Sequence, residues 1–241
     1  MAAPSFVALG AGVNGIAAVS PPWPASGNLV DDIALLFVET ANEVVTLSTP
    51  AGFVLVTLQG TGTAAGLAST RLTIFWARAT STTPPTPTIA DPGDHVAARI
   101  ATFRGCINTG DPWDVFAGDV LASPSTTVTI PGATTTVIDT RVVLSVANAT
   151  DIGTAETSVP TNAALTGITE HHDTNVTAGN GGGFDIVSAT KATAGAYGTS
   201  AATLVTSSVQ ARITIALKGP QFVPGVKPTV VPQAIMRSAV R

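Results

Sequence analysis

The densest group of side chains with metal-binding or catalytic chemistry is the run Glu170-His171-His172-Asp173. Imidazole and carboxylate groups are zinc ligands, and they also accept and donate protons. Neighbouring side chains of a strand point to opposite faces, so only Glu170 with His172, or His171 with Asp173, can share a face. A metal site needs three or four converging ligands, and His95 is the candidate third ligand. The sequence favours the alternative, a solvated strand end that enters a glycine-rich loop.

A second candidate is the segment Gly10-Ala11-Gly12-Val13-Asn14-Gly15, which matches the G-x-G-x-x-G pattern of dinucleotide-binding turns. Glu39 lies at the end of a later predicted strand, where an acid could bind ribose. In such sites the pyrophosphate lies at the N-terminus of a helix that follows the glycines. The prolines of residues 20–24 leave too little room for that helix. We therefore expect a turn or bulge between two strands, and no cofactor.

Two tryptophans, Trp23 and Trp113, are candidate contacts for a ligand or a partner. Both lie in predicted loops, where an exposed aromatic ring could stack on a sugar. Trp76 alternates with Leu72 and Ile74 in a predicted strand, so we expect it in the core. A carbohydrate-binding module for host recognition would require Trp23 or Trp113 to be exposed beside a polar groove.

Other combinations of reactive side chains lack a signature of catalysis. The chain has no G-x-S-x-G motif. Asp111, Asp114 and Asp119 lack the spacing of an EF-hand, and we expect them to bond the backbone of their own turn. The single cysteine, Cys106, excludes a disulfide within the chain and is expected to be a small buried residue. We expect no catalytic residue and no metal, and a hydrolase on a β-sandwich scaffold is the least favoured function.

The elements that must position these side chains are β-strands. Apolar and polar residues alternate in short runs separated by Gly, Pro, Asn and Asp, the pattern of strands with one buried and one wet face. Val209, Ala211 and Ile213, for example, share one face. The pattern predicts one antiparallel, jelly-roll-like β-sandwich over residues 1–218. The expected strands are residues 6–9, 15–19, 33–40, 53–59, 71–79, 95–104, 126–130, 138–147, 165–171, 184–190 and 208–218.

The composition favours a protein that packs against other subunits. Charged residues make up 11% of the 241 residues, and the net charge is −4. Soluble domains usually contain about 25% charged residues, and a weakly charged surface promotes association. Nucleic-acid binding would need a basic stripe, and a membrane span would need a longer apolar run. We expect a homo-oligomer without nucleic acid and without a membrane span.

The last segment, Gly219–Arg241, differs from the rest of the chain. Its prolines recur at every fourth position, which excludes a helix or a central strand. We expect an extended arm, with Phe222, Met236, Arg237 and Arg241 as candidate partner contacts. The arm is predicted to lie on a neighbouring subunit. The alternative is that it covers an edge of its own sandwich.

Several turns and strand ends follow one pattern. The turn Pro50-Ala51-Gly52-Phe53 precedes a strand that ends in Trp76-Ala77-Arg78, and a later strand ends in Phe103-Arg104-Gly105. Over about residues 30–218 the chain resembles Thr/Gly-rich β-sandwich structural proteins of tailed bacteriophages, which are tail- or fibre-associated or decorate the head.

This resemblance implies a non-enzymatic component of the virion that acts through contacts between subunits. Its partners would be other virion proteins and copies of itself, with a host-surface glycan as a further candidate. The shared motifs are turns and strand ends, so the resemblance implies no catalytic residue.

Overall fold

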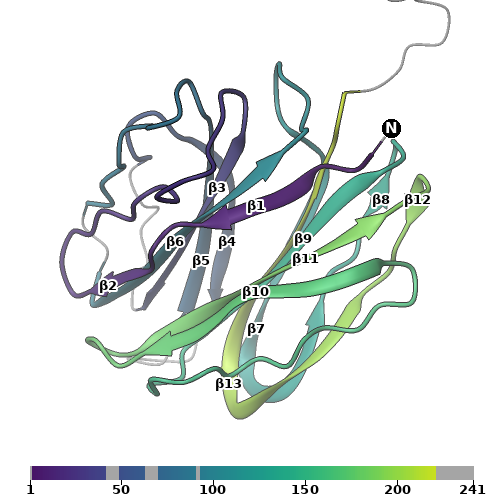
Figure 1. The fold of residues 1–241 in the computed structure, drawn as a ribbon. Coiled ribbons are helices and arrows are strands. Elements are labelled where there is room, and N and C mark those ends of the chain that lie inside the picture. The colour runs from purple at the N-terminus through teal and green to yellow at the C-terminus, as the bar shows by residue number, and fades with distance from the viewer. Residues whose placement is uncertain (1, 42–48, 63–69, 91–92, 221–241) are drawn as a thin grey trace, which may run out of the picture.

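The structure is a computed structural model that describes residues 2–41, 49–62, 70–90 and 93–220, without the side chains of residues 57–62. All regular elements of these residues are β-strands (Figure 1). The first half of the chain contains β1 (Ser5–Leu9), β2 (Val13–Gly15), β3 (Ile33–Ala41), β4 (Val54–Gly62), β5 (Thr70–Arg78) and β6 (His95–Arg104). The second half contains β7 (Trp113–Ile130), β8 (Thr134–Thr135), β9 (Thr140–Asn148), β10 (Thr166–Val176), β11 (Gly182–Lys191), β12 (Gly195–Ala196) and β13 (Ser200–Leu217).

The strands form two antiparallel sheets, which confirms the predicted β-sandwich (Figure 1). The first sheet has the order β1-β6-β3-β5-β4, and β2 pairs with β6 beyond the end of β1. The second sheet has the order β10-β11-β9-β13-β7, and β8 and β12 form a separate small ribbon. Each main sheet therefore comes from one half of the chain, and β4 and β7 are edge strands.

The main core lies between the two sheets. Phe37 of β3 and Phe184 of β11 stack with their ring centroids 6.1 Å apart, so aromatic side chains of both sheets meet at its centre. The predicted face of β13 is confirmed, because Ala211, Ile213 and Ile215 all belong to this core. Burial of these apolar side chains is the main stabilising contribution to the sandwich.

The outer faces of both sheets are also covered, so the expected wet faces are wrong. On β5, Leu72 faces the main core and Phe75 points to the outer face. Phe75 is nevertheless fully buried beneath Trp23 and Ile89, which come from loops of the first half of the chain. On β13, Arg212 points away from the main core but is only 6% exposed. Loops and the bent β7–β13 ribbon cover these outer faces, so both faces of the central strands need apolar residues.

The glycine-rich segment forms the turn that the sequence predicts. It connects β1 with β2, and both strands pair with β6. The Gly10 nitrogen donates to the Ile100 oxygen at 2.8 Å. A Cβ atom on Gly10 would lie 2.0 Å from the carbonyl oxygen of Pro22, so only glycine allows this close approach.

The described chain ends at the start of the predicted arm. The Lys218 nitrogen donates to the Pro112 oxygen at 2.9 Å, which fixes the point where β13 ends. The predicted contacts Phe222, Met236, Arg237 and Arg241 lie outside the described residues. Within the described residues there is no helix suited to crossing a membrane.

Candidate functional site

The structure corrects the positions expected for two of the tryptophans. Trp23 is only 7% exposed and packs against Phe53, because the loop after β2 folds over the outer face of the first sheet. It cannot stack on a glycan in this position. Trp76 lies in a strand as predicted but is only partly buried. Trp113 is the first residue of β7 rather than part of a loop, and it is also half-buried.

Trp113 belongs to an apolar strip on the open side of the sandwich. We define the β4–β7 lip as Val54, Trp76, Trp113, Phe116 and Val120. The rings of Trp76 and Trp113 meet edge to face at 5.7 Å, and Phe116 lies 6.3 Å from Trp113. Phe116 and Val120 lie opposite Ile215 and Ala211 in the sheet, so they point toward the main core.

The outer part of the lip is exposed because each of its two strands is the last of its sheet. Val54 is 54% exposed, Phe116 45% and Val120 38%. Among the described residues β7 pairs with β13 alone, so no described strand lies along its other edge. Large apolar side chains beside an unpaired strand edge form a surface suited to contact with another protein chain.

Two of the aspartates that were expected to form a turn, Asp114 and Asp119, also lie on this side. Asp114 lies in β7 and accepts bonds from the nitrogen and the hydroxyl of Thr136. Asp119 forms a bidentate ion pair with Arg212, whose Nε and Nη2 donate to the two carboxylate oxygens at 2.8 and 2.9 Å. The expected turn is therefore wrong from Trp113 onward, because these carboxylates bind residues far away in the sequence.

The Glu170–Asp173 run does not form the two-ligand half-site that the alternation suggests. A β-bulge between Glu170 and His172 changes the register with β11. His171 stacks on Phe6 at 3.6 Å and contacts the Ser188 hydroxyl at 2.8 Å. Asp173 accepts bonds from the backbone nitrogens of residues 156 and 157. Within the described part of the chain, no group of three His, Cys, Asp or Glu side chains could hold a metal.

His172 instead contacts Arg99 of β6, and both side chains line a cavity of about 170 Å³. The cavity lies on the side of the sandwich where β2 and β6 face β10 and β11. Arg99 Nη1 is 2.9 Å from His172 Nδ1, and Arg99 Nε donates to the Gly10 oxygen at 2.8 Å. Burial and the positive charge of Arg99 lower the pKa of His172 to about 4, so the imidazole is neutral at pH 7. Nδ1 can then accept the hydrogen bond from Arg99.

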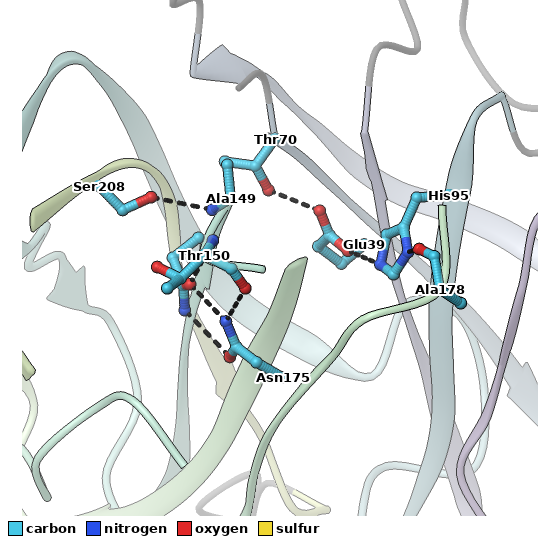
Figure 2. A network of polar contacts seen from close by, with 9 residues as sticks. Glu39, Thr70, His95, Ala149, Thr150, Asn175, Ala178 and Ser208 are labelled. Atoms are coloured by element: carbon cyan, nitrogen blue, oxygen red, sulfur yellow. Dashed lines mark hydrogen bonds and ion pairs between the residues drawn. The ribbon is translucent and has the colours of Figure 1, made fainter. Parts of the chain in front are cut away.

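His95, the candidate third ligand, forms a buried pair with Glu39 instead. Both side chains are fully buried at one end of the main core, with Nε2 of His95 2.9 Å from Oε2 of Glu39. The Thr70 hydroxyl donates to the other Glu39 oxygen at 2.8 Å, and His95 Nδ1 lies 2.5 Å from the Ala178 oxygen. Figure 2 shows this chain of contacts beside a second one around Asn175.

The contacts define how many protons the pair holds. A carbonyl oxygen only accepts, so Nδ1 of His95 carries a hydrogen. The 2.9 Å contact between Nε2 and Oε2 needs a second hydrogen, on either atom. Burial raises the pKa of Glu39 in spite of its bonds to His95 and Thr70. Burial alone would lower the pKa of His95, but the bond to Glu39 and the contact with Ala178 outweigh it and raise that pKa. Both shifts favour retention of the proton that the two side chains share.

Three successive glycines allow the β10–β11 turn to close over this pair. Residues 181–183 are buried rather than part of a surface loop. Gly182 has φ 148°, and a Cβ atom there would lie 2.8 Å from Oε1 of Glu39. The two sheets therefore come into close contact where Glu39 of β3 meets Gly182 of β11.

Substitution of Gly182 by alanine should therefore lower the free energy of unfolding by about 2 kcal/mol, through backbone strain and contact with Glu39. Chemical denaturation of both proteins measures this difference. Gly153→Ala is the matched control, because Gly153 has no positive φ and no atom within 4 Å of the added Cβ. It should change stability by less than about 0.5 kcal/mol. Equal effects of the two substitutions would contradict the explanation.

Two further side chains with reactive groups, Cys106 and Asp185, are buried. Cys106 is buried as predicted, and burial raises the pKa of its thiol to about 12. Asp185 is fully buried on β11, and burial raises its pKa well above the usual value although the Val146 nitrogen donates to it. Burial therefore disfavours the charged forms of both groups, the thiolate of Cys106 and the carboxylate of Asp185.

Comparisons of the chain with protein-family models, curated proteins and solved structures each found no match.

Sequence reasoning missed the two sites that the geometry favours. Arg99 was not singled out, although it is the one charged residue among Ala97, Ala101 and Phe103 on the inward face of β6. A charge on an apolar strand face is the signal that could have identified it. The lip was missed because the sequence around Trp113 resembles a turn.

Proposed function

We propose that this protein is a non-enzymatic structural component of a bacteriophage virion, tail- or fibre-associated or a capsid decoration. In this proposal it acts through contacts with copies of itself and with other virion proteins. The β4–β7 lip is the observation that carries the proposal, because it combines exposed apolar side chains with an unpaired strand edge. The low content of charged residues and the resemblance of the turns to phage structural proteins support it.

The arm of a neighbouring copy is the partner that fits the lip best. Residues 111–130 contain Asp111, Asp114 and Asp119 and no basic residue, although Asp119 is already paired with Arg212. Residues 221–241 contain Lys227, Arg237 and Arg241 and no acidic residue. Opposite charges favour association of the two segments and set their orientation. The arm also contains apolar residues that a solvated linker would lack, Phe222 and Met236 among them.

The point where the arm begins supports an exchange between copies. Leu217 lies opposite Trp113 in the sheet, so the arm starts at one end of the lip. An extended, proline-rich segment spans about 3.1 Å per residue and can reach tens of Å from its own domain. We propose that the arm of each copy lies along the lip of the next copy.

Truncation after Pro220 should leave a folded protein that no longer assembles, since every described strand is retained. Light scattering should report an oligomer for the full chain and a monomer for the shortened one. The full chain should also be found by mass spectrometry in purified particles, and particles made with the shortened chain should lack it. Circular dichroism of the shortened chain should retain the β-sheet spectrum.

Two further variants identify the surface that the arm occupies. Phe116→Ser should weaken assembly by at least about tenfold, because it removes exposed apolar area from the lip. Val205→Ser is the matched control, since Val205 is 78% exposed and lies outside the lip. A full chain that is monomeric, or an arm that binds the lip of its own copy, would contradict the exchange. Absence of the chain from particles would contradict the virion assignment.

A further inference from the structure

The cavity beside Arg99 contains a positive charge without a matching negative charge. Arg99 points inward from β6 between the two sheets, in line with the core residues Ala97 and Ala101. Within residues 2–220, as far as they are described, no carboxylate pairs with its guanidinium. Arg99 is only partly exposed, and this burial lowers the pKa of its guanidinium. A partly buried charge usually has a partner of opposite charge.

The guanidinium also has unused donors. Of its five N–H groups, one is directed at Gly10 and one at His172. The others have no partner among the described residues and remain for a group that enters the cavity. His172 is held neutral, so it adds no second positive charge at pH 7.

The walls of the cavity indicate the size and chemistry of the missing partner. Val13, Val176 and Phe184 supply apolar contacts, and Asn14 and Thr174 add polar groups at the rim. A volume of about 170 Å³ is smaller than the usual range of about 300–1,000 Å³ for drug-sized ligands. A fully hydrated dianion such as phosphate would lose more solvation against these apolar walls than a small organic monoanion.

We propose that this cavity binds a small organic carboxylate, whose two oxygens accept hydrogen bonds from the free N–H groups of Arg99. The planar guanidinium matches the two oxygens of a carboxylate in geometry as well as in charge. The short apolar body of the ligand lies against Val13, Val176 and Phe184. This site is on the opposite side of the sandwich from the β4–β7 lip, so the proposal does not depend on the assembly mechanism.

Propionate is a suitable probe, with propionamide as its uncharged counterpart. The full chain, in a buffer without carboxylate or phosphate, is titrated while the ring signals of His172 are followed by nuclear magnetic resonance. We expect saturable shifts with a dissociation constant on the order of 1 mM, and a rise in the pKa of His172 because an anion binds beside it. Propionamide should cause no saturable shift, and phosphate should bind at least about tenfold more weakly than propionate.

Two variants and one control connect the binding to this cavity. Arg99→Gln should abolish the response, and Val13→Phe should weaken it by filling the cavity while leaving the charge in place. Arg141→Gln is the matched control, because Arg141 is also partly buried and bonds a carbonyl through Nε but does not line this cavity. Unchanged propionate binding in Arg99→Gln, equal binding of propionamide, or tighter binding of phosphate would overturn the proposal.

Discussion

Replacement of Glu39 by alanine should lower the free energy of unfolding by about 3–5 kcal/mol. The substitution removes one partner of a fully buried pair. It leaves Nε2 of His95 and the hydroxyl of Thr70 without their bonds in a site that water does not reach. Urea denaturation at pH 7, followed by fluorescence, measures the loss.

Glu39→Gln is the control that separates pairing from charge. Its amide oxygen can accept from Thr70, and its amide nitrogen can donate to Nε2 of neutral His95, so every bond of the pair is retained. This variant should lose only about 1 kcal/mol. A loss below about 1 kcal/mol for Glu39→Ala would show that the pair contributes little to stability.

The Glu39–His95 pair determines whether the free energy of unfolding rises or falls at alkaline pH. Because the pKa of His95 is raised in the folded protein, the folded state keeps a proton that the unfolded state has released. The free energy of unfolding must therefore fall as the pH rises from about 6.5 through the raised pKa. Glu39→Gln, with its neutral His95, should show a smaller decline in this range.

At acidic pH the largest loss of folding stability should be caused by protonation of His172. Its pKa is lowered to about 4 in the folded protein, so the unfolded state binds a proton first as the pH falls below about 6.5. Stability from this residue should be complete above pH 6.5 and should decrease by up to about 3 kcal/mol by pH 4. Denaturation midpoints measured between pH 7.5 and 4 provide the curve.

His172→Asn isolates this contribution from that of the other titrating groups. The Asn oxygen can accept the bond from Arg99 that Nδ1 of His172 accepts, but it cannot be protonated in this range. The difference in stability between the two proteins should shrink steadily from pH 6.5 to 4. A constant difference would mean that His172 titrates near its ordinary pKa.

Local patterns were sufficient to predict much of the sandwich. The alternation in β13 identified its inward face, and the apolar runs located β3, β5, β6, β9 and β11 to within a few residues. The proline block after Gly15 was enough to predict a turn instead of a phosphate-binding loop. These features depend on the conformation of a few neighbouring residues, which the sequence determines directly.

Other features depend on contacts between distant segments, which no local pattern contains. The expected strand begins at residue 126, because Asp111, Asp114 and Asp119 are assigned to a turn from the sequence. Pairing with β13 overrides that preference. Trp23 is a candidate for an exposed ring from the sequence, because nothing local shows that its loop folds over a sheet.

The candidate sites could be predicted only in part from the sequence, for the same reason. The sequence identifies Glu39 only as an acid at a strand end that could bind ribose. Its partner His95 is on another strand, and only the register of β3 with β6 brings them together. The Glu170–Asp173 run was noticed as well, but a β-bulge and the approach of Arg99 determine what each of its side chains contacts.

The division of the two sheets between the halves of the chain has a consequence for synthesis on the ribosome. The first sheet is complete once Arg104 has emerged, and Trp23, Phe53 and Ile89 from the same half already cover its outer face. The second sheet cannot close until β13 arrives, because this last strand lies between β9 and β7. Synthesis proceeds at about 5–20 residues per second, so the inner face of the first sheet, which includes Phe37, stays uncovered for on the order of ten seconds. During that interval the nascent chain presents an open apolar layer, and this is the stage at which chaperones would have the largest effect on the yield of folded protein.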